Sequence, residues 1–149
     1  MSLSFLIHRR SVTAVAVAAG LGLAAGTATA APSHREIKTV KISAGRVLAA
    51  SNNHVLYLFE KDGKNVSHCD STCRAYWPPV RSKGSAMAAA HVSARHLGLT
   101  KKGQVTYYGH PLYFYVGDTE PLQDNGQGST ASGGAWYVVG TNGHAIDSD

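Results

Sequence analysis

Tyr57-Leu58-Phe59-Glu60-Lys61-Asp62 and Tyr113-Phe114-Tyr115-Val116-Gly117-Asp118 are two copies of one pattern, Tyr-x-aromatic-x-x-Asp, in a chain of 149 residues. The composition of the chain gives an expectation of about 0.02 chance matches, so two copies point to a duplication. A tryptophan follows each copy, Trp77 at 20 residues after the first tyrosine and Trp136 at 23 residues after the second. Shared landmarks in a fixed order predict two repeats of one β-rich unit rather than a single catalytic centre.

Both copies of the pattern are expected to lie on strands whose two faces are covered. Neighbouring side chains of a strand point in opposite directions, so Tyr57 and Phe59 share one face while Leu58 points to the other. The second copy repeats this arrangement, with Tyr113 and Tyr115 on one face. Since both faces carry apolar side chains, we expect packing on each side of these strands.

The aspartate of each copy falls in a turn, because Asp62 precedes Gly63 and Asp118 follows Gly117. We expect the aromatic side chains to pack the core against the two tryptophans while the aspartates cap their turns. The alternative is a polar site in which the tyrosine hydroxyls and the carboxylates come together to bind a ligand or a cation.

The first 30 residues have the organisation of an export signal. Arg9-Arg10 end a basic head, residues 12–25 are apolar but short for a membrane span, and Ala28-Thr29-Ala30 offers small residues before a cleavage site near Ala30-Ala31. The arginine pair has some twin-arginine character, but the residues after it fit that signal poorly, which favours the general secretory route. The first cysteine is Cys69, so we expect no lipid anchor and no stable membrane insertion after signal removal.

Outside the predicted signal the chain carries 12 basic and 9 acidic residues, a net charge of +3. Only Lys101 and Lys102 are adjacent among the basic residues, so we interpret them as a scattered, solvated surface. A nucleic-acid partner would favour clustering on one element, and none is expected.

Cys69 and Cys73 are the only cysteines, and an even count in an oxidising compartment predicts one disulfide. The spacer of three residues differs from the Cys-x-x-Cys of redox centres, and two thiolates alone do not complete a zinc site. We expect the bridge to hold a local turn.

The pattern along residues 31–149 predicts a single, mainly β domain with two pseudo-symmetric antiparallel repeats, at about 37–80 and 91–140. Short helical turns are expected at 74–77 and at 93–97, where Gly98 would end the second turn. Residues 81–90 are small and polar, which is typical of a linker between the halves, and the tail after 141 is expected to be loose. The strands are expected at 37–43, 46–51, 54–60, 104–108, 112–116 and 135–140.

Neither a cofactor nor a catalytic centre is predicted. The chain has no Gly-x-Ser-x-Gly elbow, no phosphate-binding loop and no dinucleotide fingerprint. Histidine is frequent outside the predicted signal and suits copper, zinc or haem iron, but no pair of histidines has a defined metal spacing. These histidines are His34, His54, His68, His91, His96, His110 and His144.

Four stretches together resemble a bacterial family of secreted repeats of unknown function, often described as predicted lipoproteins with a Tyr-x-(Phe/Trp/Tyr)-x-x-Asp motif. They are LYLFEKD at 56–62, CDSTCRAYWPPV at 69–80, QVTYYGHPLYFYVGD at 104–118, and NGQG with WYVV at 125–139. The resemblance implies an extracytoplasmic, β-rich protein with two repeats in each domain. It also implies that the tyrosine, aromatic and aspartate positions of the two copies are signature positions, without giving them a role.

The function expected from these features is that of an exported, non-enzymatic binding or structural module of the cell envelope or the extracellular space, with an unknown ligand. The alternative is an accessory protein in copper or haem binding or in extracytoplasmic electron transfer, which the histidines, tyrosines and cysteines suggest.

Overall fold

The computed structural model describes residues 34–147, and the predicted export signal at 1–30 lies outside this range. The described chain is mainly β, as the alternating sequence pattern predicts, with short strands in three small sheets. In chain order the elements are β1 (Glu36–Ile42), β2 (Gly45–Ala50), β3 (Tyr57–Phe59), α1 (Ser71–Tyr76), β4 (Met87–Ala88), η1 (Ala94–His96), β5 (Leu97–Leu99), β6 (Val105–Tyr107), β7 (His110–Pro111), η2 (Ala131–Gly133) and β8 (Trp136–Val138). None of the helices in the described range has the length and apolar character needed to cross a bilayer.

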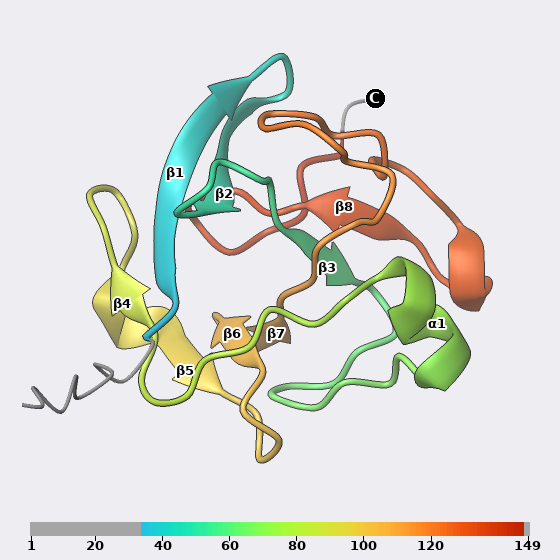
Figure 1. The fold of residues 1–149 in the computed structure, drawn as a ribbon, viewed down its shortest axis with the longest axis horizontal. Helices are drawn as coiled ribbons and strands as arrows, with labels where there is room; N and C mark the ends of the chain where they lie inside the picture. The colour runs from blue at the N-terminus through green and yellow to red at the C-terminus, as the bar shows by residue number, and fades with distance from the viewer. Residues whose placement is uncertain (1–33, 148–149) are drawn as a thin grey trace, which may run out of the picture.

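The sheets have the orders β2-β1-β4, β3-β8 and β5-β6-β7. Figure 1 shows the long β1–β2 hairpin along one edge of the molecule and α1 on the opposite side, with β3 and β8 between them. All pairings are antiparallel except that of β1 with β4, which is parallel.

A local two-fold relation joins the two copies of the sequence pattern. Tyr57 and Tyr113 form an antiparallel bridge in which each backbone N–H donates to the other residue's carbonyl over 2.9 Å. On its other side Tyr57 faces Val138, and Tyr113 faces Pro79. Each of these partners lies two residues after the tryptophan of the opposite copy, so the segment that contains each tryptophan pairs with the other repeat. The two repeats are therefore interleaved rather than placed side by side.

The alternation in the sequence separates two hydrophobic cores, as predicted for strands covered on both faces. Leu56 and Leu58 belong to one core with Leu112, whereas Tyr57 and Phe59 belong to the other. The second core contains both tryptophans, three further aromatic side chains and both cysteines: Tyr57, Phe59, Cys69, Cys73, Trp77, Tyr113 and Trp136.

Four local expectations are wrong. The strand expected at 112–116 is not formed, because β7 ends at Pro111 and the second copy of the pattern pairs only through isolated bridges of Tyr113. Residues 81–90 are more than a linker, because β4 lies within them and pairs with Glu36 and Ile37 at the edge of β1. Gly98 does not end a helical turn but lies in β5 opposite Thr106, where a Cβ would come within 3.0 Å of the threonine hydroxyl. The tail is held as far as Ile146, whose side chain packs on the second core.

Candidate functional site

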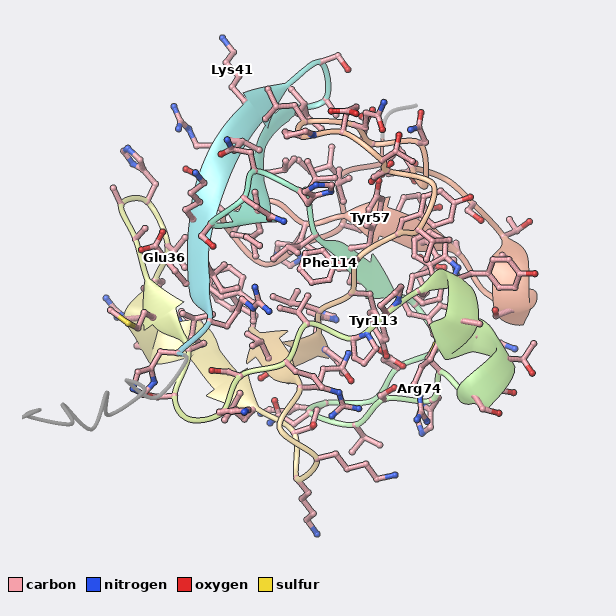
Figure 2. All side chains as sticks on the ribbon, in the orientation of Figure 1. Glu36, Lys41, Tyr57, Arg74, Tyr113 and Phe114 are labelled. Carbon is pink, nitrogen blue, oxygen red and sulfur yellow. A yellow bond between two sulfur atoms is a disulfide. The ribbon has the colours of Figure 1, made fainter. Side chains whose placement is uncertain are left out.

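The signature tyrosine of the first copy binds the aspartate of the second. The Tyr57 hydroxyl donates to Oδ2 of Asp118 over 2.6 Å and accepts a hydrogen bond from the Gly126 N–H at 3.3 Å. The other oxygen of Asp118 accepts from the backbone N–H of Asn125 at 2.9 Å. Tyr57 is fully buried and Asp118 is 5% exposed, so this charged hydrogen bond lies in the interior. Figure 2 shows Tyr57 and Tyr113 near the centre of the molecule.

The reciprocal bond joins the tyrosine of the second copy to the aspartate of the first. The Tyr113 hydroxyl donates to Oδ2 of Asp62 over 2.7 Å and lies 2.7 Å from Oγ of Ser67. A phenol has one proton, so when Asp62 accepts it the Ser67 hydroxyl donates to the phenol oxygen. The remaining oxygen of Asp62 accepts from the His68 N–H at 2.7 Å. We call these two Tyr–Asp pairs the reciprocal brace.

The reciprocal brace has one feature of each arrangement that the sequence left open, the capped turns of the first and the contact between hydroxyls and carboxylates of the second. Asp62 and Asp118 do order their turns, since each accepts a backbone N–H from six or seven residues further along. The tyrosine hydroxyls do meet the carboxylates, but each pair takes one member from each repeat. All four carboxylate oxygens already have a partner within the chain.

Burial shifts the proton affinities of the brace. Loss of solvation raises the pKa of Tyr57 and of Tyr113 above the ordinary value of a phenol. Loss of solvation also raises the pKa of Asp62 and of Asp118, and the hydrogen bonds from the two tyrosines oppose this. The phenols therefore stay protonated, and remain donors, at a pH where an exposed tyrosine would ionise.

Four aromatic side chains at the second core form a continuous stack, in the order Phe59, Trp136, Trp77 and Tyr115. The two indoles lie 3.9 Å apart at an angle of 2°. Phe59 stacks on Trp136 at 4.2 Å, and Tyr115 stacks on Trp77 at 4.4 Å. Each tryptophan therefore stacks on the aromatic residue of the other copy. This stack gives the second core a rigid centre that neither repeat supplies alone.

The two tryptophans differ in one polar contact. Nε1 of Trp136 donates to the Ala131 carbonyl at 2.9 Å, which η2 brings into position. Nε1 of Trp77 is buried and has no partner among the described residues. Gly126 approaches Trp77 so closely that a Cβ there would lie 2.7 Å from the indole. The sequence shows two equivalent tryptophans, and only the fold reveals that the Trp77 N–H has no partner among residues 34–147.

The disulfide between Cys69 and Cys73 is confirmed, with its Cα atoms 5.3 Å apart. It holds the start of α1, where the Asp70 side chain caps the helix by accepting the Cys73 N–H at 2.9 Å. The Nε–H of Arg74 donates to the Cys69 carbonyl at 2.8 Å. The bridge therefore fixes a short helix and also fixes a cation on it.

The histidines do not gather into a metal centre within residues 34–147, where no group of three His, Cys, Asp or Glu side chains could hold an ion. His68 contacts the Lys61 carbonyl through Nδ1 at 2.6 Å, and His96 stacks on Tyr108 at 3.7 Å. Burial, and then the nearby His144, lower the pKa of His110.

The fold gathers basic side chains that are far apart in the sequence, contrary to the expectation of a scattered surface. A groove of about 450 Å³ runs between the segment 64–67, α1 and the β5–β6 hairpin. Five cations line it: Lys64, Arg74, Arg81, Lys101 and Lys102. We call this the basic groove. The adjacent pair at 101–102 is its only signal in the sequence, because the other members come from separate loops and from α1.

A family model described as a secreted repeat of unknown function matches the chain at residues 38–81 and 99–140. The two matched segments cover more than half of the chain, and they are the segments that meet at the bridge between Tyr57 and Tyr113. This result confirms the resemblance that the sequence motifs indicate. Comparison with curated proteins and with solved structures gives no match.

Proposed function

Because the chain belongs to this family of secreted repeats of unknown function, we propose that it is an exported, non-enzymatic module that binds a ligand of the cell envelope or the extracellular space. The observation that carries the proposal is the reciprocal brace. The tyrosines and aspartates of the motif are the groups that the sequence offers as a reactive site. In the fold they are hydrogen-bonded to each other in the interior, Tyr57 to Asp118 and Tyr113 to Asp62.

This arrangement supports a scaffold role for the signature motif. A general base or a ligand must be reachable from solvent, but both tyrosines are fully buried. The stacked indoles are fully buried as well, so the second core has the features of a packed interior. The brace joins the two repeats and thereby keeps the surface loops in fixed positions, as a binding module requires.

The surface of the scaffold offers a place for a ligand in the basic groove, whose volume is within the range typical of ligand sites. The disulfide supports function outside the reducing cytoplasm, since such bridges persist in oxidising compartments. Together, the buried motif, the cross-linked helix and the concave surface favour binding over catalysis.

The test uses the exported protein recovered from the medium of an expressing strain. It is mixed separately with sedimentable peptidoglycan, with soluble wall polymers and with neutral glycans, and both partners are then analysed. We expect saturable binding to at least one envelope fraction, with the ligand recovered at unchanged mass. Conversion of the ligand would contradict a non-enzymatic role, and binding to none of the fractions would contradict a binding module. Stoichiometric uptake of copper or haem, lost on His→Ala substitution, would favour the alternative role in metal or electron handling.

A further inference from the structure

The basic groove is lined by cations and by no acidic side chain. The lining also includes Val66, which is 51% exposed, and the half-buried Leu99. An exposed valine beside several cations gives a surface that suits an organic chain with charged groups better than a bare inorganic ion. The tip of the β5–β6 hairpin carries Lys101 and Lys102, and Gly103, with φ of 75°, closes this turn by donating to the Thr100 carbonyl.

No cation of the groove forms an ion pair with a carboxylate of residues 34–147. A set of unpaired positive charges at short range raises the free energy of the empty groove and is relieved by an anionic partner. Unpaired positive charges therefore indicate that the ligand carries negative charge.

Two arginines of the groove are held in position by backbone carbonyls. Arg81 donates from one terminal nitrogen to the Lys102 carbonyl at 2.8 Å, and Arg74 donates from Nε to the Cys69 carbonyl. Each guanidinium has five N–H donors, so most of its donors remain available after these bonds. Guanidinium groups fixed in this way are suited to bind phosphate or carboxylate groups in a defined geometry.

A second hollow of about 400 Å³ continues the basic groove, because Arg81 and Lys102 line both. It adds further cations, Arg35 and Lys83, again without an acidic side chain. Seven of the 12 basic residues outside the predicted signal therefore lie along one track. Lys41 is not part of this track: it lies near the end of β1 that is farther from Arg74 (Figure 2). A track of this kind is longer than a site for one small anion requires.

We propose that the basic groove and its continuation bind an anionic polymer of the cell envelope whose repeating units carry phosphate or carboxylate groups. This proposal rests on the proposed function and gives the ligand its chemical class. A nucleic acid is disfavoured because neither lining contains a phenylalanine, tyrosine or tryptophan ring on which a base could stack.

The experiment measures binding of the exported protein to four soluble probes matched in length: polyglycerol phosphate, polygalacturonate, neutral dextran and a DNA oligonucleotide. We expect binding of the phosphate polymer, the carboxylate polymer or both, and the two affinities distinguish these sources. Affinity should fall at least about tenfold between low and physiological salt, because binding releases counterions. Equal binding of dextran, or binding of DNA as tight as that of the better polymer, would overturn the proposal.

The decisive variant is Lys101→Glu/Lys102→Glu, at an exposed turn. Its control is Lys38→Glu/Lys41→Glu on β1, which makes the same change in net charge outside both hollows. We expect the groove variant to bind the anionic polymer at least about tenfold more weakly and the control to bind within about twofold of the parent. Thermal melting of each variant shows whether the fold is kept. An equal loss of affinity in the two variants would show that the basic groove is not the binding site.

Failure of this inference differs from failure of the proposed function. If an envelope fraction binds the parent and the groove variant equally, the groove is not the site but the protein is still a binding module. If no envelope fraction binds the parent, the proposed function fails, and absence of binding to both anionic probes then overturns the groove as well.

Discussion

The hydroxyl of Tyr57 donates to Asp118 over 2.6 Å across 61 residues of sequence, and Tyr113 returns the same bond to Asp62 over 2.7 Å. Each copy of the motif is therefore completed by the other. Charge-assisted bonds of this kind, in the interior, are stronger than those between neutral groups, and leaving one partner unsatisfied is costly.

A double-mutant cycle should find an energetic coupling between the tyrosine of one repeat and the aspartate of the other, and none between the tyrosine and the aspartate of the same repeat. Tyr57→Phe and Asp118→Asn should each lower the free energy of unfolding by about 1–3 kcal/mol, and together they should cost less than the sum of the two. The matched cycle of Tyr57→Phe with Asp62→Asn should be close to additive, because Asp62 bonds Tyr113 instead. Chemical denaturation of the single and double variants measures both cycles. Coupling within one copy and additivity across the copies would contradict the reciprocal brace.

The two tryptophans should respond differently to replacement by phenylalanine. Both substitutions remove buried area from the ring stack, but Trp136→Phe also removes the bond to the Ala131 carbonyl. Trp77→Phe instead removes an N–H that has no partner among the described residues. We therefore expect Trp136→Phe to destabilise the protein by about 1 kcal/mol more than Trp77→Phe, as measured by denaturant unfolding. The opposite order would show that the Trp77 N–H has a stabilising partner.

Alkaline pH should weaken the fold through the two buried phenols. The folded pKa of Tyr57 and of Tyr113 is raised, so their contribution to stability is complete below the unfolded value near 10.0 and is lost as the pH rises above it. In a titration followed by phenolate absorbance, these two tyrosines should ionise only as tryptophan fluorescence reports unfolding. The Tyr57→Phe/Tyr113→Phe variant should lack this late step. If both phenols ionise near their ordinary pKa while the fluorescence stays native, burial does not control their titration.

Reduction of the Cys69–Cys73 bridge should cost about 2 kcal/mol, since the loop that it closes is short. A Cys69→Ala/Cys73→Ala variant should lose the same amount and should no longer respond to reductant. Thiol titration of the unfolded, unreduced protein should find no free thiol. Two free thiols would show that the exported protein does not carry the bridge.

Part of this structure can be predicted from local pattern alone. Alternation around Tyr57 and Phe59 predicts strands covered on both faces, and the two hydrophobic cores confirm it. The spacing of Cys69 and Cys73 predicts their bridge, because the two residues are near in sequence and have no other possible partner.

Other features depend on contacts that no local pattern contains. β4 has little strand character of its own, and the exposed edge of β1 makes it a strand. The exchange of partners in the brace cannot be predicted without knowing which turn approaches which tyrosine. Apart from the lysine pair at 101–102, the sequence gives no sign of the basic groove, because Lys64, Arg74 and Arg81 come from segments that only the fold brings together.

The exchange of partners has a consequence for the origin of the chain. A polypeptide with a single Tyr-x-aromatic-x-x-Asp unit would have no hydrogen-bonding partner for its phenol and its carboxylate and no stacking partner for its indole. Two such molecules facing each other across a dyad could supply all three, with the axis passing where Tyr57 now meets Tyr113. Joining two such units in one polypeptide fixes this arrangement without an intermolecular contact, and within it Trp77 and Trp136 differ in their polar contacts.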